Sequence, residues 1–388
     1  MLIKEVKARI IRDSRNCETI SVSVNGCNEA SSPNGKSTGD YETPSYYKSL
    51  KFCVDFLNKW DGEVYVKRFN DLAKVEKIIC KKLKLRNAKM FGANALYAFE
   101  SAILKALAFE TGKELFEVAG NSRKIPYPVG NVIGGGLHSS AIKKHPNFQE
   151  FLVIPKSMKF SINLKVMNYI YSKLKGKLKT SKVNDEGALL VSLDDKEVFD
   201  LINSVRFEAE KKFGTLIEFG IDAAASSFFK KGKYNYMDKK ISENEQYKLI
   251  EEIILNYDLN YVEDPVHQRD FNGFAKIQKA LGKKCLIVGD DLTATQYSRT
   301  VNAIQTKSIN SIIIKPNQNG SLIELRKIFD LCKKYGIKTV LSHRSGETLD
   351  SGLADYAVGL GADYIKCGVS TKWREAKLNR LLKIEEKL

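Results

Sequence analysis

The sequence predicts an α/β protein, in which a smaller α+β domain over residues 1–124 precedes a β/α barrel over residues 125–388. Two observations predict this division. After Pro128, short β-rich runs alternate with amphipathic helical stretches, and successive runs end roughly 25 to 40 residues apart, the length that a strand, a loop and a crossover helix require. Before Pro126, two alternating strands are followed by long stretches of helical spacing. Many β and α units in series favour a barrel of parallel strands.

The first domain contains three kinds of segment. Residues 3–11 and 19–24 alternate apolar and polar side chains, which is typical of half-buried strands. Residues 29–40 are rich in Ser, Pro, Asn and Gly, so we expect a mobile loop there. From residue 48 to 119 the apolar side chains recur at helical spacing. This order predicts a small sheet, an exposed loop and a set of helices.

Most predicted strands of the second domain carry a charged or ionisable side chain at one end. Taken singly, each one is more often a surface ion-pair partner or a helix cap. The carboxyl ends of barrel strands meet at one mouth, however, so the ordered series predicts one cleft that gathers them. In chain order these residues are Glu150, Glu186, Asp222, Glu263, Asp290, Lys315, His343 and Lys366.

Such a cleft needs cations, because carboxylates in a low-dielectric site repel one another unless they are neutralised. Oxygen ligands without a nearby cysteine pair favour Mg²⁺ over zinc. Asp222, Glu263 and Asp290 lie on three consecutive predicted strands and could face one ion. Lys315 follows on the next strand, and a neighbouring ion should lower its pKa enough to make it a general base. A base beside a metal suits abstraction of a proton α to a carboxylate.

The chain resembles the enolase (phosphopyruvate hydratase) family over nearly its whole length. The run Ser-His-Arg-Ser-Gly-Glu-Thr that begins at Ser342 is highly specific, and so is the order of the motifs. The family's sites pair a Lys or His base with one or two Mg²⁺ ions. The matching segments begin at Asp13, Lys36, Phe91, Gly135, Gln149, Asp185, Asp222, Glu263, Gly289, Ile314, Ser342 and Ile365, and the C-terminal segment from Arg374 also matches.

The resemblance implies an enzyme, a hydro-lyase that reversibly dehydrates 2-phosphoglycerate to phosphoenolpyruvate in glycolysis and gluconeogenesis. It implies two Mg²⁺ ions per site, the first held by Asp222, Glu263 and Asp290, the second by Ser37 on the mobile loop. It also implies an α+β cap domain and a barrel whose second strand runs antiparallel. Lys36, beside Ser37, adds a cation to that loop.

The resemblance also implies roles for the remaining site residues. Lys315 would take the C2 proton, and Glu186, assisted by Glu150, would act as general acid on the departing hydroxyl. Lys366 would contact the substrate carboxylate. An arginine suits bidentate phosphate binding, which agrees with the role that the resemblance implies for Arg344. Phosphate would be held by Arg344 and Ser345, and the pocket would be lined by His138, Gln149 and His343.

Two alternatives stay open beside this enzyme. One is a related lyase acting on another phosphorylated hydroxy acid. The other is a scaffold or RNA-binding protein, because the net charge is +17. Lysine pairs without interleaved aromatic residues fit a solvated surface better, so nucleic acid is not an expected partner.

The seven cysteines form no Cys-x-x-Cys pair, the charged N-terminus is unlike a secretory signal, and no run of the sequence would span a membrane. We expect a cytoplasmic protein without a membrane partner, a homodimer or higher homo-oligomer.

Overall fold

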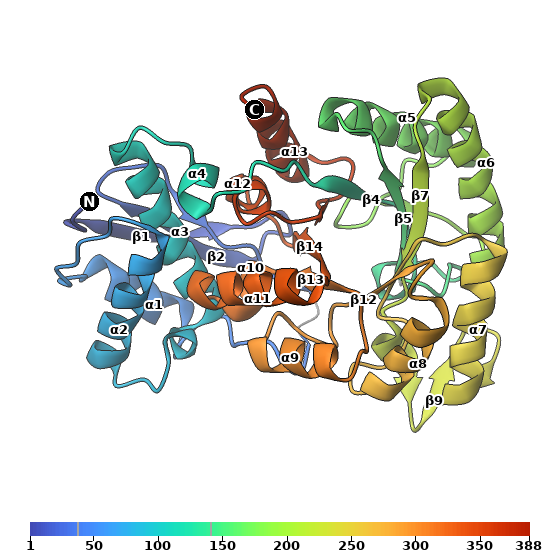
Figure 1. The fold of residues 1–388 in the computed structure, drawn as a ribbon, viewed down its shortest axis with the longest axis horizontal. Helices are drawn as coiled ribbons and strands as arrows, with labels where there is room; N and C mark the ends of the chain where they lie inside the picture. The colour runs from blue at the N-terminus through green and yellow to red at the C-terminus, as the bar shows by residue number, and fades with distance from the viewer. Residues whose placement is uncertain (37–38, 140–141) are drawn as a thin grey trace.

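The computed structural model describes residues 1–36, 39–139 and 142–388. Figure 1 shows the N-terminal elements on one side and the barrel with its outer helices on the other. The N-terminal sheet is antiparallel, in the order β1-β2-β3. Its strands are β1 (Val6–Arg12), β2 (Glu18–Val24) and β3 (Ala30–Ser31). The helices packed beside it are α1 (Leu50–Asn58), α2 (Leu72–Leu83), α3 (Ala93–Glu110) and α4 (Leu115–Ala119).

The second part is a closed barrel, because β15 pairs with β4 and completes the ring. Around it the ring strands are β4 (Tyr127–Gly134), β5 (Glu150–Pro155), β7 (Ile217–Asp222), β11 (Tyr261–Glu263), β12 (Leu286–Gly289), β13 (Ser311–Ile314), β14 (Lys338–Ser342) and β15 (Tyr364–Lys366). Outside the ring lie β6 (Leu189–Leu190), which pairs with β4, and a small sheet of β8 (Phe229–Lys230), β9 (Lys233–Asn235) and β10 (Lys240–Ile241).

The helices of the second part surround the barrel (Figure 1). They are α5 (Phe160–Leu178), α6 (Asp195–Phe213), α7 (Glu243–Asn256), α8 (Phe271–Leu281), α9 (Tyr297–Gln305), α10 (Pro316–Asn319), α11 (Leu322–Tyr335), α12 (Gly352–Gly359) and α13 (Lys372–Glu385). Short 3₁₀ helices cover Phe69–Asp71, Ala88–Phe91, Gly136–Ser139 and Ala225–Phe228. The predicted fold class, an enolase-type barrel after a smaller α+β domain, is confirmed. Within the described residues, no helix is both long and apolar enough to cross a membrane.

The direction of β5 corrects the prediction of an all-parallel barrel. β5 pairs antiparallel with both β4 and β7, as the family resemblance implied. Glu150 is therefore the first residue of its strand, and the reversal brings this N-terminal end to the mouth where the other strands end. The spacing of the β runs could not show this, because an apolar run has the same period in both directions.

Glu186 is the second correction, since it lies in a loop and not at the end of a strand. Residue Val183 makes only an isolated bridge with Leu189, and β6 begins after Glu186. The side chain of Asn184 builds this loop, because its Oδ1 accepts from the backbone N–H groups of Glu186 and Ala188, each at 3.0 Å. Local polar bonds of this kind compete with strand pairing.

The barrel interior is filled, so the chemistry is confined to one end. A cluster of apolar and aromatic side chains closes the centre of the ring, as is usual for parallel barrels. This plug leaves the polar residues above it facing a cavity. Its buried members are Val129, Leu152, Ile154, Tyr261, Val288, Ile313, Val340 and Tyr364.

Candidate active site

The barrel mouth contains a cavity of about 220 Å³ at the level where the strands end. The cavity walls come from the barrel loops and from the N-terminal loop that starts at Gly35. The structure therefore brings together most of the residues singled out from the sequence. Those that line the cavity are His138, Gln149, Glu150, Glu186, Asp222, Asp290, Lys315, His343, Arg344, Ser345 and Lys366. Ser37 lies outside the described residues.

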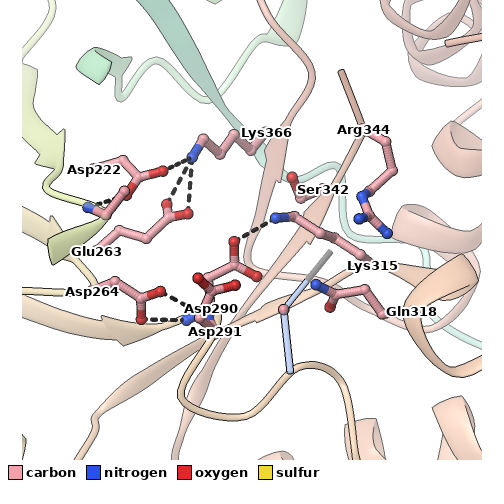
Figure 2. A network of polar contacts seen from close by, with 12 residues as sticks. Asp222, Glu263, Asp264, Asp290, Asp291, Lys315, Gln318, Ser342, Arg344 and Lys366 are labelled. Carbon is pink, nitrogen blue, oxygen red and sulfur yellow. Dashed lines mark hydrogen bonds and ion pairs between the residues drawn. The ribbon is translucent and has the colours of Figure 1, made fainter. Parts of the chain in front are cut away.

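Three buried carboxylates form one row across neighbouring strands. Asp222 of β7 is in register with Glu150 on one side and with Glu263 on the other. The ammonium of Lys366 lies among them, with its Nζ 2.8 Å from Glu150, 3.2 Å from Asp222 and 2.9 Å from Glu263. Figure 2 shows this side chain pointing at Asp222 and Glu263. The hydroxyl of Tyr261 also donates to Glu263, at 2.7 Å.

Burial and charge decide how these groups titrate. Burial raises the pKa of Asp222, and it raises the pKa of Glu263 far more, with a further contribution from the charge of Asp222. Burial alone would lower the pKa of Lys366, but the carboxylates of Glu150 and Glu263 raise it well above its usual value. The row therefore demands a positive charge, and in this structure the ammonium of Lys366 supplies it.

A second acidic group lies at the ends of β11 and β12. Carboxylate oxygens of Asp264, Asp290 and Asp291 lie within 4.8 Å of one another. Asp264 accepts from the backbone N–H groups of Asp290 and Asp291, at 2.9 and 2.7 Å. The ammonium of Lys315 pairs with Asp290 (Figure 2). Burial and the charge of Asp290 raise the pKa of Asp291 to about 7.

The ion pair between Lys315 and Asp290 opposes the expected fall in the lysine pKa. Burial lowers the pKa of Lys315, but the Asp290 carboxylate outweighs it and holds the lysine protonated. In the same pair, burial would raise the pKa of Asp290, and the ammonium overcomes this and lowers it. Lys315 can accept a proton from carbon only when another positive charge shares the Asp290 carboxylate.

Glu150 and Glu186 form a coupled pair beside two histidines. Ligand atoms of His138, Glu150 and Glu186 lie within 4.8 Å of one another. Nε2 of His343 lies 3.7 Å from Oε2 of Glu186. Burial raises the pKa of Glu150, whereas His138 and a nearby arginine, acting against burial, lower the pKa of Glu186. The two buried carboxylates therefore titrate as a coupled pair, and burial favours the protonated form of Glu150.

Arg344, expected to bind phosphate, is already engaged by a carboxylate. Its Nη1 and Nη2 each lie 3.0 Å from an oxygen of Glu42, and Nη1 also contacts Asn317 at 3.3 Å. This is the bidentate geometry that an arginine offers to a carboxylate or a phosphate. A phosphate at Arg344 would therefore take the place of Glu42, a residue that sequence reasoning missed.

The loop that precedes Ser37 is pinned to the segment after β14. Asn34 and Gly346 exchange two backbone hydrogen bonds, of 2.7 and 2.9 Å. At Gly35 an added Cβ would lie 1.9 Å from Nη2 of Arg344, so a larger residue there would displace the end of that arginine side chain. Lys36, the extra cation of this loop, lies 3.4 Å from Asp185. The described part of the loop is thus held against both Arg344 and the Glu186 loop.

The residues at the mouth fit a divalent cation of the oxygen-binding kind. Oδ1 of Asp290 is buried without a hydrogen-bond partner, so it is free to ligate. The donors are carboxylates, which Mg²⁺ prefers. The three carboxylates expected to hold the first Mg²⁺ do not surround one point in this structure. Asp222 and Glu263 contact Lys366, whereas Asp290 lies with Asp264 and Asp291.

Sequence reasoning missed several residues of this site. Asp264 and Asp291 directly follow Glu263 and Asp290, so their adjacency to strand ends was a usable signal. For Glu42 the sequence carried no comparable signal, since its partner Arg344 lies 302 residues away along the chain. Asn317 lies 27 residues from Arg344 and two residues after Lys315.

Comparison with known proteins agrees with this geometry. A family model described as the enolase C-terminal TIM barrel domain matches residues 122–388. A curated relative named enolase from Archaeoglobus fulgidus is 33% identical, over 100% of this chain and 98% of its own length. One from Natronomonas pharaonis is 35% identical, over 99% of each chain. One from Thermoplasma acidophilum is 36% identical, over 99% of this chain and 98% of its own.

Proposed function

The chain belongs to the enolase family, and we propose that its barrel mouth catalyses the reversible dehydration of 2-phosphoglycerate to phosphoenolpyruvate. It is a hydro-lyase, a phosphopyruvate hydratase. The observation that carries the residue assignment is the pairing of Lys315 with Asp290 beside a row of buried carboxylates. A lysine so placed can act as a base once its carboxylate is shared.

Divalent cations complete the site in this proposal. Asp222, Glu263 and Asp290 would hold the first Mg²⁺, and Ser37, which lies outside the described residues, would hold a second. Bound there, such ions would supply positive charge beside the substrate carboxylate, and Asp290, shared with an ion, would hold the Lys315 ammonium less tightly. Lys366 would exchange its carboxylate partners for the carboxylate of the substrate.

The proton movements follow from the neighbours of each group. Lys315 Nζ takes the proton from C2 of the substrate. Glu186 gives a proton to the departing 3-hydroxyl, assisted by Glu150, whose pKa is raised by burial. His138 lies 3.7 Å from Glu150 and helps to define this end of the cavity.

Substrate is held from the opposite wall. Arg344 binds the phosphate in place of Glu42, with Ser345 beside it. Gln149 and His343 line the remaining wall. The segment from Asn34 to Lys36 already crosses this wall, so closure of the loop would exclude water from the charged groups.

The test is the formation of phosphoenolpyruvate from 2-phosphoglycerate, followed by absorbance with Mg²⁺ and with EDTA. We expect turnover with Mg²⁺, none with EDTA, and none for Lys315→Ala in a folded protein. Wild-type-like activity of that variant would overturn the base assignment. Conversion of another phosphorylated hydroxy acid, with 2-phosphoglycerate left unchanged, would favour the related lyase, which the comparisons do not favour.

Three further expectations belong to the same proposal. We propose division into domains near residue 124 and a cytoplasmic location, in keeping with seven cysteines that are all free thiols. We also propose a homodimer or higher homo-oligomer, because Phe109 and Leu349 line one surface hollow with exposed fractions of 75% and 62%. Sedimentation would test it, with a monomer as the contrary result.

A further inference from the structure

Helix α13 contributes a fully buried arginine that packs against the segment after β14. Arg374 is 0% exposed. Its Nη2 donates to the carbonyls of Arg344 and Ser345, at 3.2 and 3.0 Å. Its Nη1 contacts the hydroxyl of Thr371 at 3.5 Å, and its Nε donates to Nδ1 of His343 at 3.3 Å. These four acceptors are neutral, so none of them offsets the desolvation cost of the buried guanidinium charge with a negative charge.

The contact with His343 decides where the imidazole carries its proton. A guanidinium is a donor only, and it is not deprotonated in proteins. Nδ1 of His343 must therefore be the acceptor, and the single proton of the neutral ring must sit on Nε2. That nitrogen faces Oε2 of Glu186 at 3.7 Å, an oxygen that is buried without a hydrogen-bond partner.

We propose that Arg374 is a positioning residue that fixes His343 as the neutral Nε2–H tautomer and so aims a hydrogen-bond donor at Glu186. The proposal rests on the proposed function, in which Glu186 acts as the general acid. A donor beside Glu186 orients the carboxylate toward the substrate. The same contact prevents the imidazolium, because a proton on Nδ1 would point at the guanidinium.

The cations around His343 act in the same direction as the Arg374 contact. The ring is enclosed by α13, by the strands that end at the mouth and by the Glu186 loop. Burial, followed by the charge of Arg374, lowers the pKa of His343 well below its usual value. The Glu186 carboxylate lies against the Nε2 side of the ring. Besides Arg374, the charged groups facing the ring are Glu186, Lys366, Lys315 and Lys377.

Lys377 offers a matched control on the same helix. It lies one turn after Arg374 and is also buried. Its Nζ contacts Oε2 of Glu347 at 2.5 Å and the carbonyl of Thr348 at 2.6 Å. It therefore supports the same segment after β14, without a hydrogen bond to His343. Loss of Lys377 removes a buried cation and a support, but leaves the tautomer contact in place.

The experiment reads the tautomer directly by ¹⁵N NMR of full-length protein labelled at the imidazole nitrogens. The chain has 4 histidines, so His343→Asn identifies the relevant signals by their loss. In the wild type we expect a pyridine-like Nδ1 and a pyrrole-like Nε2 for His343, unchanged from pH 8 to pH 5. In Arg374→Met we expect both nitrogens to shift toward exchange between tautomers. In Lys377→Met we expect the wild-type tautomer.

Two results would overturn the proposal: a protonated Nδ1 in the wild type, or an unchanged His343 pattern in Arg374→Met. The first needs no variant, so the proposal stays testable even where Arg374→Met does not fold. The tautomer is measured without substrate, so a failure to convert 2-phosphoglycerate would count against the proposed function alone. In a folded Arg374→Met we expect kcat to fall roughly 10-fold, less than the 10²–10⁴-fold of a lost general acid, with KM changed less.

Discussion

Replacing Lys366 with methionine should make the stability of the protein depend on a divalent cation. The ammonium contacts Glu150, Asp222 and Glu263 at distances between 2.8 and 3.2 Å, and every partner is buried. Removing one member of a buried ion pair costs about 3–5 kcal/mol, because the remaining charge loses its partner. In EDTA at pH 7 we therefore expect Lys366→Met to lower the free energy of unfolding by about that amount.

A bound divalent cation should restore much of the free energy of unfolding that Lys366→Met loses. A ligand at 100 times its dissociation constant adds about 2.7 kcal/mol to a native state that alone binds it. In the variant, Mg²⁺ no longer competes with an ammonium for Asp222 and Glu263. The stabilisation by Mg²⁺, measured by urea unfolding, should therefore be at least as large in Lys366→Met as in the wild type.

The pH dependence of the loss has a definite sign. Burial already raises the pKa of Asp222 and Glu263 in the folded protein, and loss of the ammonium raises both further. A carboxyl with a raised pKa holds its proton in the native state, so it contributes stability at low pH that is lost as the pH rises. The deficit of Lys366→Met should thus be smaller at pH 5 than at pH 7.

Lys156 supplies the matched control at the other end of the barrel. Its Nζ lies 3.2 Å from Glu218 and 4.1 Å from the ring centroid of Tyr127, away from the cavity residues. Because this pair is partly exposed, Lys156→Met should cost about 1 kcal/mol, independently of Mg²⁺. A Lys366→Met variant within about 1 kcal/mol of the wild type in EDTA, or an equal loss in Lys156→Met, would refute the reasoning.

Three further variants test other parts of the site. Lys315→Ala should lower kcat by at least roughly 10²-fold, the lower range for a lost general base, while circular dichroism shows a folded protein. Asp291→Asn should raise the free energy of unfolding in EDTA, and more at pH 8 than at pH 5, because burial and Asp290 raise the Asp291 pKa to about 7 and the cost of its charge grows as the pH rises toward that value; no gain at pH 8 would contradict this. Arg344→Lys should raise KM for 2-phosphoglycerate by roughly 10- to 100-fold, since lysine cannot form the bidentate pair, and an unchanged KM would remove Arg344 from the phosphate site.

The sequence was sufficient for the parts of the site that depend on local pattern. Apolar runs that end in a polar residue identified β7, β11 and β12, together with Asp222 and Glu263 at the ends of the first two and Asp290 directly after the third. Strand direction was beyond that pattern, since β5 reads the same either way. The effect of Asp290 on the Lys315 pKa was equally beyond that pattern, because the charge of Asp290 acts through a contact between two strands.

Register explains why the chemistry of this mouth cannot be separated from the packing of the barrel. Glu150, Asp222 and Glu263 stand in one row only because β5, β7 and β11 pair at a fixed register. Successive side chains of a strand point to opposite faces, so a shift of one residue would turn a carboxylate away from Lys366. The same shift would bring the alternating residues Leu152 and Ile154 out of the apolar plug. The packing of the apolar plug therefore also fixes the positions of the carboxylates. A variant that repacks this plug should change metal affinity without altering any ligand residue.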